Sequence, residues 1–363
     1  MKRRTVVRLL GAAVVTGGAA ACGIGAAPAL LAPPRAVTSA EGQRVALSAA
    51  QATPAPVVAV AVAVEPTATP APTAIPTPTP APLPTIAVVP TATATPAPTA
   101  TAVPQKGGPL GPNRLVTWYG HPEDNRMGIL GEFSDPRAMI GGLKAQTMAY
   151  TDADPAHPAI PTLELIASVA SHLPNADGLY LNVTRAKTIE QYVQMAHDND
   201  CLLLLDIQFG YDTVENEINR LLPYLKLPHV HLAIDPEFKV KRGQVPGKVY
   251  GSVTAAEVTY AANVLANLVK QHRTPDKVLV LHQFRGDVFP DKPKIKPVSG
   301  VQMVVMMDGF GGTEAKVGNY GAFVRDEPIQ FGGIKLFYKQ DKPVMAPKEI
   351  IALSPSPLVV SYQ

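Results

Sequence analysis

Carboxyl side chains stand at the ends of apolar runs in the second half of this 363-residue chain. In "VHLAIDPEFKV" an apolar run ends in Asp235 and Glu237, and in "CLLLLDIQ" four leucines precede Asp206. Carboxyl groups that are crowded at one place repel one another, so the pKa values of some of them rise. A carboxyl group that stays protonated near neutral pH can act as a general acid.

The elements that would position these residues alternate regularly. Helical patterns separate eight short, continuously apolar runs, which is typical of a parallel sheet covered on both faces. Eight such runs in about 250 residues predict a (β/α)8 TIM barrel. A doubly wound open sheet is the alternative, but no Gly-rich phosphate loop follows the first run. The runs span residues 114–120, 159–167, 201–208, 230–235, 277–284, 301–309, 333–339 and 357–363.

In a TIM barrel the active site lies at the C-terminal ends of the strands, where core packing does not explain polar residues. Taken singly, Asp235 and Asp308 could start a turn, and His282 could be a structural histidine. Glu164 lies between apolar neighbours, so it needs a partner in the barrel or a place at its end. The prediction depends on the coincidence of many polar residues at strand ends. The candidate substrate-binding residues are Tyr119, His121, Glu164, Gln208, His282, Gln283, Asp308 and Tyr338.

Glycoside hydrolysis fits this pattern, because it needs two carboxyl groups across a glycosidic bond. The expected catalytic residues are Glu237 as general acid, Asp206 as nucleophile or base, and Asp235 as a group that orients them or tunes their pKa values. Aromatic residues would hold the sugar rings. The candidates for that role are Trp118, Tyr119, Phe238 and Tyr338.

Two other readings stay open. Metal-assisted phosphodiester cleavage would use His121, Glu164 and His282 as ligands or acid–base groups, although the His-Arg start and Glu-x-Asp spacing of glycerophosphodiesterases are missing. A barrel without chemistry would bind a wall glycan or a partner protein. Substitution of Asp206 or Glu237 by its amide distinguishes a hydrolase from a pure binding protein.

The first part of the chain has a different composition. Residues 1–22 have a basic start, a short apolar stretch and small residues before Cys22, which predicts an export signal of twin-arginine or lipoprotein type with a lipidated Cys22. Residues 23–112 are rich in Pro, Thr and Ala, which predicts a disordered, extended linker. Residues 113–363 form the predicted barrel domain. The chain is therefore expected to be exported, and either lipid-anchored at the cell envelope or secreted.

Charge and cysteine content exclude some functions. Seven of the 32 basic and two of the 29 acidic residues precede residue 107, which leaves a net charge of −2 in the rest. Nothing there indicates binding to nucleic acid. Cys201 is the only cysteine after residue 22, so we expect a small core residue and neither a disulfide framework nor a zinc cluster. We predict no cofactor and no metal.

Several segments resemble those of uncharacterised bacterial exported proteins and lipoproteins with a glycosidase-like TIM barrel. They include "GHPEDNRMGILGEF", "VLVLHQF", "IKLFYKQD" and the long stretch from "LLLLDIQFG" to "HLAIDPEF". The resemblance implies a barrel and export, and it brings no established activity. The Asp-x-x-Asp-x-Asp-x-Glu strand of chitinase-like barrels is absent, as is an Asn-Glu pair at the end of the fourth strand. From the carboxyl residues at the strand ends, the predicted partner is a polysaccharide or cell-wall glycan. From residues 1–22, a second predicted partner is the membrane, through Cys22.

Overall fold

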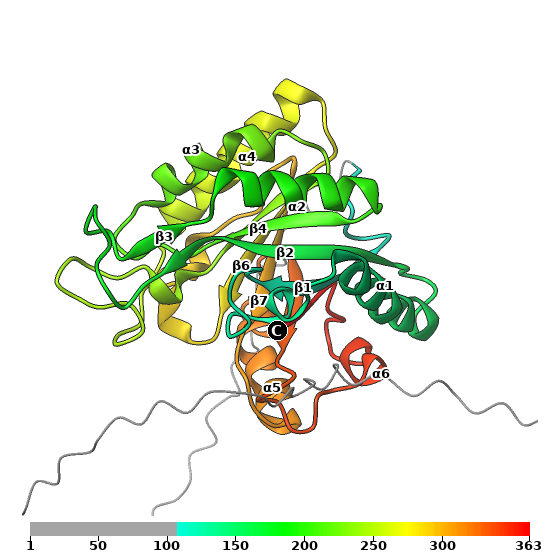
Figure 1. Cartoon of the computed structure of the whole chain (residues 1–363). Helices are drawn as coiled ribbons and strands as arrows, with labels where there is room; N and C mark the ends of the chain where they lie inside the picture. The colour runs from blue at the N-terminus through cyan, green and yellow to red at the C-terminus, as the bar shows by residue number, and fades with distance from the viewer. Residues whose placement is uncertain (1–106) are drawn as a thin grey trace, which may run out of the picture. The chain divides into compact units, whose positions relative to one another are not determined.

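The computed structural model describes residues 107–363, which form a closed barrel of eight parallel strands (Figure 1). The barrel closes because β1 pairs with β2 on one side and with β9 on the other. This confirms the predicted (β/α)8 fold. The export signal, Cys22 and most of the predicted linker lie outside the described residues. The barrel strands are β1 (Arg114–Gly120), β2 (Ala159–Ala170), β4 (Leu202–Ile207), β5 (Val230–Ile234), β6 (Lys277–Gln283), β7 (Val301–Met307), β8 (Phe331–Leu336) and β9 (Val359–Tyr362).

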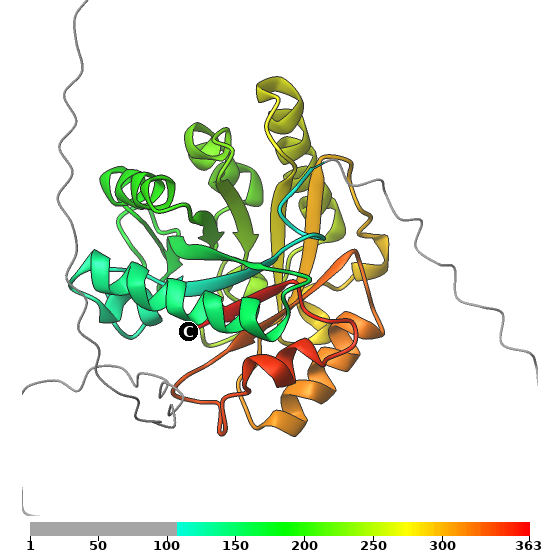
Figure 2. The same ribbon diagram turned by 90° about the vertical axis from the view of Figure 1, so that its right-hand side faces the viewer.

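Helices surround the strands, as the view in Figure 2 shows. Between β6 and β7 the described chain has only two short 3-10 turns, η3 (Gly286–Val288) and η4 (Lys292–Lys294). Further 3-10 turns, η1 (Ile129–Glu132) and η2 (Pro236–Phe238), follow β1 and β5, and a π-helical turn (Gly321–Arg325) continues α5. The helices are α1 (Pro136–Ala153), α2 (Ala186–Asp198), α3 (Val214–Leu225), α4 (Ala255–His272), α5 (Thr313–Tyr320) and α6 (Pro347–Ile351).

Side chains cap several of these helices. The carboxylate of Asp135 accepts a hydrogen bond from a backbone N–H at the start of α1, and Thr254 forms a capping box with Glu257 at the start of α4. In "TIEQYV", Thr188 precedes an apolar stretch, which predicts a cap for α2 as well, and this prediction is wrong. The helix begins earlier, after Arg185, and Thr188 lies in its first turns.

One strand was not predicted. β3 (Leu181–Val183) pairs antiparallel with the last residues of β2, so a short hairpin extends the barrel at its C-terminal end. The register with β4 shifts between Ile166 and Ser168, which indicates a bulge where β2 leaves the barrel. The chain after β2 therefore returns as β3 and pairs with the end of that strand.

The core has two layers. The larger lies between the strands and the helices, and includes Cys201, a buried free cysteine as predicted. The smaller fills the N-terminal half of the barrel with apolar side chains such as Leu204, Val280 and Val304. Among the helices of residues 107–363, none is both long and apolar enough to cross a membrane.

Residues 107–113 close the N-terminal end of the barrel. Leu110 is fully buried in the inner apolar layer, and its backbone N–H and C=O both bind the amide of Gln302 at the start of β7 (2.9 and 2.8 Å). Gly108 lies so close to Gln302 that a Cβ atom at residue 108 would stand 2.4 Å from that side chain. Gly108 and Leu110, which precede the predicted start of the domain at residue 113, thus pack against the barrel.

Candidate active site

The C-terminal half of the barrel contains charged side chains where the N-terminal half contains apolar ones. Five carboxyl groups come from β2 and β4, from the turn after β5 and from the residue after β7, and we call them the carboxylate cluster. All except Glu237 are buried or nearly so. The members are Glu164, Asp206, Asp235, Glu237 and Asp308.

Two basic side chains lie among these carboxyl groups. His282 of β6 is 1% exposed and stands between two of them: its Nδ1 is 2.8 Å from Asp308 Oδ2, and its Nε2 is 3.2 Å from Glu164 Oε1. Lys335 of β8 is 3% exposed and donates to the same Asp308 oxygen at 3.1 Å. Its Nζ also lies 3.6 Å from the ring centroid of Tyr119, a cation–π contact.

Both carboxylate oxygens of Glu164 have hydrogen-bond partners within the barrel. Its second oxygen accepts hydrogen bonds from Thr117 Oγ1 at 2.8 Å and from Ser361 Oγ at 2.6 Å, and its first faces His282. The partner that a buried glutamate requires is thus supplied by three different strands. Three donors to one carboxylate favour its charged form, so Glu164 suits a structural anion better than an acid.

These contacts set the charges of one half of the site. Burial favours the neutral form of Glu164 and Asp308, but His282 and Lys335 hold both pKa values below the usual range. Burial likewise opposes the charged form of His282, but Asp206, Asp308 and Glu164 raise its pKa well above the usual value. The pKa of Lys335 is also raised, chiefly by Asp308 against the effect of burial. Near neutral pH, two carboxylates and two cations therefore compensate each other.

Asp206 differs from these paired groups. Its side chain is fully buried, and neither carboxylate oxygen has a hydrogen-bond partner. The nearest basic atom is His282 Nε2, at 3.8 Å. Burial raises the pKa of Asp206 to about 7, with His282 opposing the rise and Asp235 adding to it. Asp206 thus changes its charge near neutral pH, and both of its carboxylate oxygens lack a hydrogen-bond donor within the described residues.

Asp235 and Glu237 follow β5 on one 3-10 turn. The carboxylate of Asp235 caps the turn, accepting the backbone N–H of Glu237 at 3.1 Å, and also accepts Gln208 Nε2 at 3.3 Å. Burial raises the pKa of both groups, that of Glu237 to about 8, with Asp235 and Asp308 adding to the effect. The pKa values of these carboxyl groups are thus raised, but burial contributes more to the rise than the crowding expected from the sequence. Glu237 is half-buried and protonated at neutral pH, as a general acid must be.

The structure brings eight of the predicted site residues together and places three elsewhere. His121 lies on the loop after β1, where its ring binds Thr184 Oγ1 at 3.1 Å and accepts the backbone N–H of Glu123. Gln283 points to the outer side of the barrel and accepts Lys292 Nζ at 2.7 Å. Tyr338 donates to Gln146 of α1. The eight together are Tyr119, Glu164, Asp206, Gln208, Asp235, Glu237, His282 and Asp308.

The metal-dependent reading required His121 beside Glu164 and His282, and the contacts of His121 include neither. Within residues 107–363, no three His, Cys, Asp or Glu side chains are arranged so that they could hold one metal ion.

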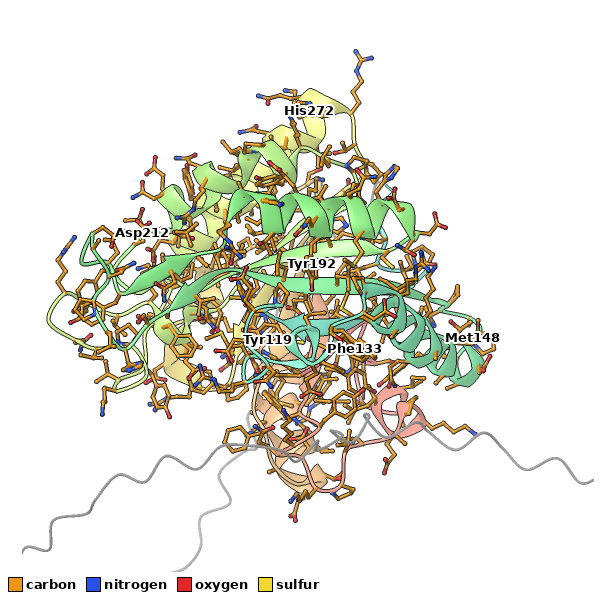
Figure 3. The ribbon with its side chains drawn as sticks, viewed as in Figure 1. Tyr119, Phe133, Met148, Tyr192, Asp212 and His272 are labelled. Atoms are coloured by element: carbon orange, nitrogen blue, oxygen red, sulfur yellow. The ribbon has the colours of Figure 1, made fainter. Side chains whose placement is uncertain are left out.

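The aromatic residues named from the sequence also have other surroundings. Trp118 is 5% exposed and stacks on Phe133 (labelled in Figure 3), with 5.3 Å between ring centroids. Tyr119 is 3% exposed and lies under the ammonium group of Lys335. Phe238 is half-buried, and Tyr338 stacks on Tyr362 at 5.1 Å, beside α1.

Three residues of the site were missed. Lys335, Thr117 and Ser361 all face the barrel interior from β8, β1 and β9. The signal was present for Lys335, because a single charged residue interrupts the apolar run "GGIKLF" just as Glu164 interrupts its own. Thr117 and Ser361 are polar residues at alternating positions in buried strands, which is a weaker signal.

No protein-family model and no curated protein matches the sequence. Several solved structures of glycoside hydrolases are similar to it in fold. They include a GH5-4 broad-specificity endoglucanase from Clostridium longisporum (9% identity, covering 61% of this chain and 75% of that one, TM-score 0.34). Another is a GH18 chitinase from Pseudoalteromonas aurantia (11% identity, covering 69% of this chain and 94% of that one, TM-score 0.32). A third is a Bacillus subtilis mannanase (12% identity, covering 70% of this chain and 82% of that one, TM-score 0.33). At these identities and TM-scores no residue role is carried over from them.

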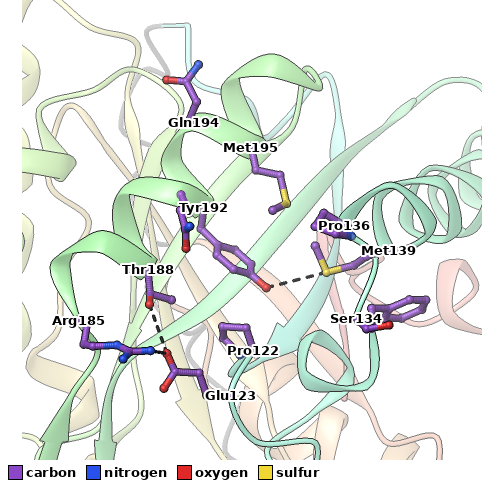
Figure 4. A pocket seen from close by; sticks show the side chains of 12 residues that line it. Pro122, Glu123, Ser134, Pro136, Met139, Arg185, Thr188, Tyr192, Gln194 and Met195 are labelled. Atoms are coloured by element: carbon purple, nitrogen blue, oxygen red, sulfur yellow. Dashed lines mark hydrogen bonds and ion pairs between the residues drawn. The ribbon is translucent and has the colours of Figure 1, made fainter.

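A separate cavity of about 550 Å³ lies between α2 and the start of α1, with residues of the loop after β1 also lining it (Figure 4). Met139, Tyr192 and Met195 line it, and the ion pair of Glu123 with Arg185 stands at one side. The hydroxyl of Tyr192 points to the sulfur of Met139 at 4.0 Å. None of the residues that line this cavity belongs to the carboxylate cluster.

Proposed function

We propose that the barrel is a glycoside hydrolase that acts on a polysaccharide or cell-wall glycan. The observation that carries this proposal is the division of the carboxylate cluster into two kinds. Glu164 and Asp308 are ion-paired and stay charged, whereas Asp206 and Glu237 have no hydrogen-bonded cation and titrate near neutral pH. Two carboxyl groups whose surroundings separate their roles are what acid–base cleavage of a glycosidic bond requires.

In this mechanism Glu237 donates its proton to the glycosidic oxygen as the bond to the leaving sugar breaks. Asp206, whose carboxylate oxygens have no hydrogen-bond partner in the barrel, either attacks the anomeric carbon or takes a proton from the attacking water. Asp235 fixes the turn that carries Glu237, and its charge helps to keep Glu237 protonated. His282 and Lys335 supply positive charge beside Asp206, which favours its ionised form.

Product release tests this function directly. The full chain is incubated with a panel of wall and extracellular polysaccharides, and soluble products are identified by mass spectrometry. We expect oligosaccharides from at least one polymer, and none from Glu237→Gln. Glu215→Gln, which changes an exposed acid on α3, should release the same products as the natural chain. Saturable binding to one polysaccharide, with no product from any polysaccharide of the panel, would mean that the barrel is a binding protein.

The pH dependence of hydrolysis provides a second test. The active form has Asp206 ionised and Glu237 protonated, and their pKa values are about 7 and about 8. The value of kcat/KM for an uncharged polymer should therefore be highest between about pH 7 and 8 and fall about tenfold per pH unit beyond each side. Thermal unfolding over the same pH range controls for loss of the fold. A rate that rises steadily down to pH 5 would contradict these roles.

We further propose that the protein is exported and anchored to the membrane through Cys22, with residues 23–112 as a spacer. The support is the sequence of residues 1–22, with its basic start and its small residues before Cys22. Metabolic labelling with a radioactive fatty acid should mark the natural chain and not Cys22→Ser. Secretion of unlabelled protein into the medium would favour simple signal cleavage.

A further inference from the structure

Two aromatic side chains stand out by their exposure. In residues 107–363, Phe310 is 69% exposed and Tyr250 is 56% exposed. Both lie on loops that follow strands, Tyr250 after β5 and Phe310 after β7, at the end of the barrel that holds the carboxylate cluster. Exposed aromatic rings leave apolar area in water, and rings that also face a polar site often mark a binding surface.

The surroundings of Tyr250 hold its ring in place. Phe284 packs against it with ring centroids 5.1 Å apart and planes at 62°. The guanidinium of Arg285 lies 4.8 Å from the ring centroid and is itself held by two 2.7 Å bonds to Asp287. The next residue, Gly251, donates its N–H to the carbonyl of Glu237 at 2.6 Å. The backbone next to Tyr250 is therefore fixed to the backbone of the expected general acid.

Phe310 is fixed in a similar way on another loop. Its ring meets Phe337 edge to face at 6.0 Å, and it follows Asp308 by two residues. The loop is held by the buried ion pair of Lys316 with Asp341, at 2.9 Å. Lys316 Nζ also donates to the carbonyl of Gly309, and Asp341 accepts the N–H of Gly311. Both neighbours of Phe310 are thus bound, which leaves its ring exposed on a rigid support.

We propose that Tyr250 and Phe310 are stacking platforms for the pyranose rings of a polysaccharide chain that crosses the carboxylate cluster. The proposal rests on the proposed function and specifies its substrate as a polymer of several pyranose units. Pyranose rings present an apolar face of C–H groups that packs on an aromatic ring, while their hydroxyl groups stay in water. One platform is connected to Glu237 and the other to Asp308, so each would bind sugars beside the bond to be cleaved.

Single rings on two separate loops suit a chain of sugars better than a second copy of this protein. A stable protein–protein interface buries about 800 Å² on each partner, whereas one aromatic side chain provides about 150–250 Å². The sugars bound at the platforms lie outside the bond-breaking centre. Loss of a platform should therefore weaken binding of a long chain more than cleavage of a short one.

Affinity gel electrophoresis tests this proposal without requiring hydrolysis. The full chain carrying Glu237→Gln is run through gels that contain hydroxyethylcellulose, galactomannan or glycol chitosan. We expect Tyr250→Ala and Phe310→Ala each to weaken binding to one of these polymers about tenfold, and Tyr250→Phe and Phe310→Tyr to keep it. The matched control is Met148→Ala. Met148 is 58% exposed and lies on α1, away from both loops (labelled in Figure 3).

The outcomes separate this proposal from the proposed function. Retardation that depends on both rings, with no product from any polymer, would support the stacking role of the rings and contradict the proposed hydrolase function. Hydrolysis by the natural chain, with equal retardation and equal products in both alanine variants, would overturn the platforms alone. Absence of retardation for every polymer would also overturn them. Sedimentation gives one more check: a dimer that both alanine changes dissociate, with glycan binding unchanged, would mean that the rings contact a second copy instead.

Discussion

Asp206→Asn should lower the rate of hydrolysis by about 10³-fold or more and at the same time stabilise the protein. The loss of rate follows because an amide can neither attack the anomeric carbon nor accept a proton from water. The gain in stability follows because Asp206 is fully buried and has no hydrogen-bond partner, so its ionisation costs free energy in the folded state.

The sign and size of this gain depend on pH. The pKa of about 7 in the folded protein exceeds the ordinary aspartate value, so the folded state binds more protons between about pH 4 and 7. Stability is therefore lost as the pH rises through this window, and an asparagine does not have this loss. We expect a free energy of unfolding about 2–4 kcal/mol higher for the variant at pH 8, and nearly equal values at pH 4.

Chemical denaturation at both pH values measures the effect. Asp152→Asn changes an exposed aspartate on α1 and should alter the free energy of unfolding by less than about 0.5 kcal/mol at either pH. A variant that is less stable than the natural chain at pH 8 would show that the carboxylate of Asp206 stabilises the fold. A variant that hydrolyses glycans at the natural rate would show that Asp206 takes no part in the reaction.

Lys335→Met should destabilise the protein by about 3–5 kcal/mol at pH 7. Lys335 is buried, and its removal leaves Asp308 with His282 as its only cationic contact, among four other carboxyl groups. The pKa of Lys335 is raised in the fold, so its contribution is fully present below about pH 10 and is lost only above that. The pKa of Asp308 is lowered, so its contribution is present at pH 7 and is lost in acid.

Two further variants show whether the buried charge causes this effect. Lys339→Met removes a lysine that is 67% exposed and paired with Glu132, and should cost about 0–1 kcal/mol. The double change Lys335→Met with Asp308→Asn removes both members of the buried pair, and should cost less than the two single changes added together. Additive losses in the denaturation curves would mean that the two side chains act independently, and a loss equal to that of Lys339→Met would rule out a special role for Lys335.

The barrel could be predicted because its strands are buried on both faces and therefore read as continuous apolar runs. β3 has three residues, "LNV", and it pairs with β2 across the loop of residues 171–180, a pairing that no local pattern shows. Thr188 resembled a cap because it precedes an apolar stretch, but the helix begins at Ala186 before it. Local signals thus identified the elements and missed the contacts that extend or shift them.

The site could be predicted only in part, because position along a strand does not give the direction of a side chain. Neighbouring residues point to opposite faces, so His282 enters the barrel while Gln283 points outward. Loop residues are harder still: Phe289 and Phe310 both lie in polar loops, yet the first is 2% exposed and the second 69%. Exposure depends on what packs against the loop, and this is set by distant residues such as Asp341.

The packing of Leu110 against the bottom of the barrel fixes where any tether would be attached. Everything that precedes Gly107 joins the domain at the N-terminal ends of the strands, whereas the carboxylate cluster lies at their C-terminal ends. A pull on that tether would act on the closed apolar end and would not pass through the charged end. A large polymer could then approach the carboxyl groups from the side away from the attachment point.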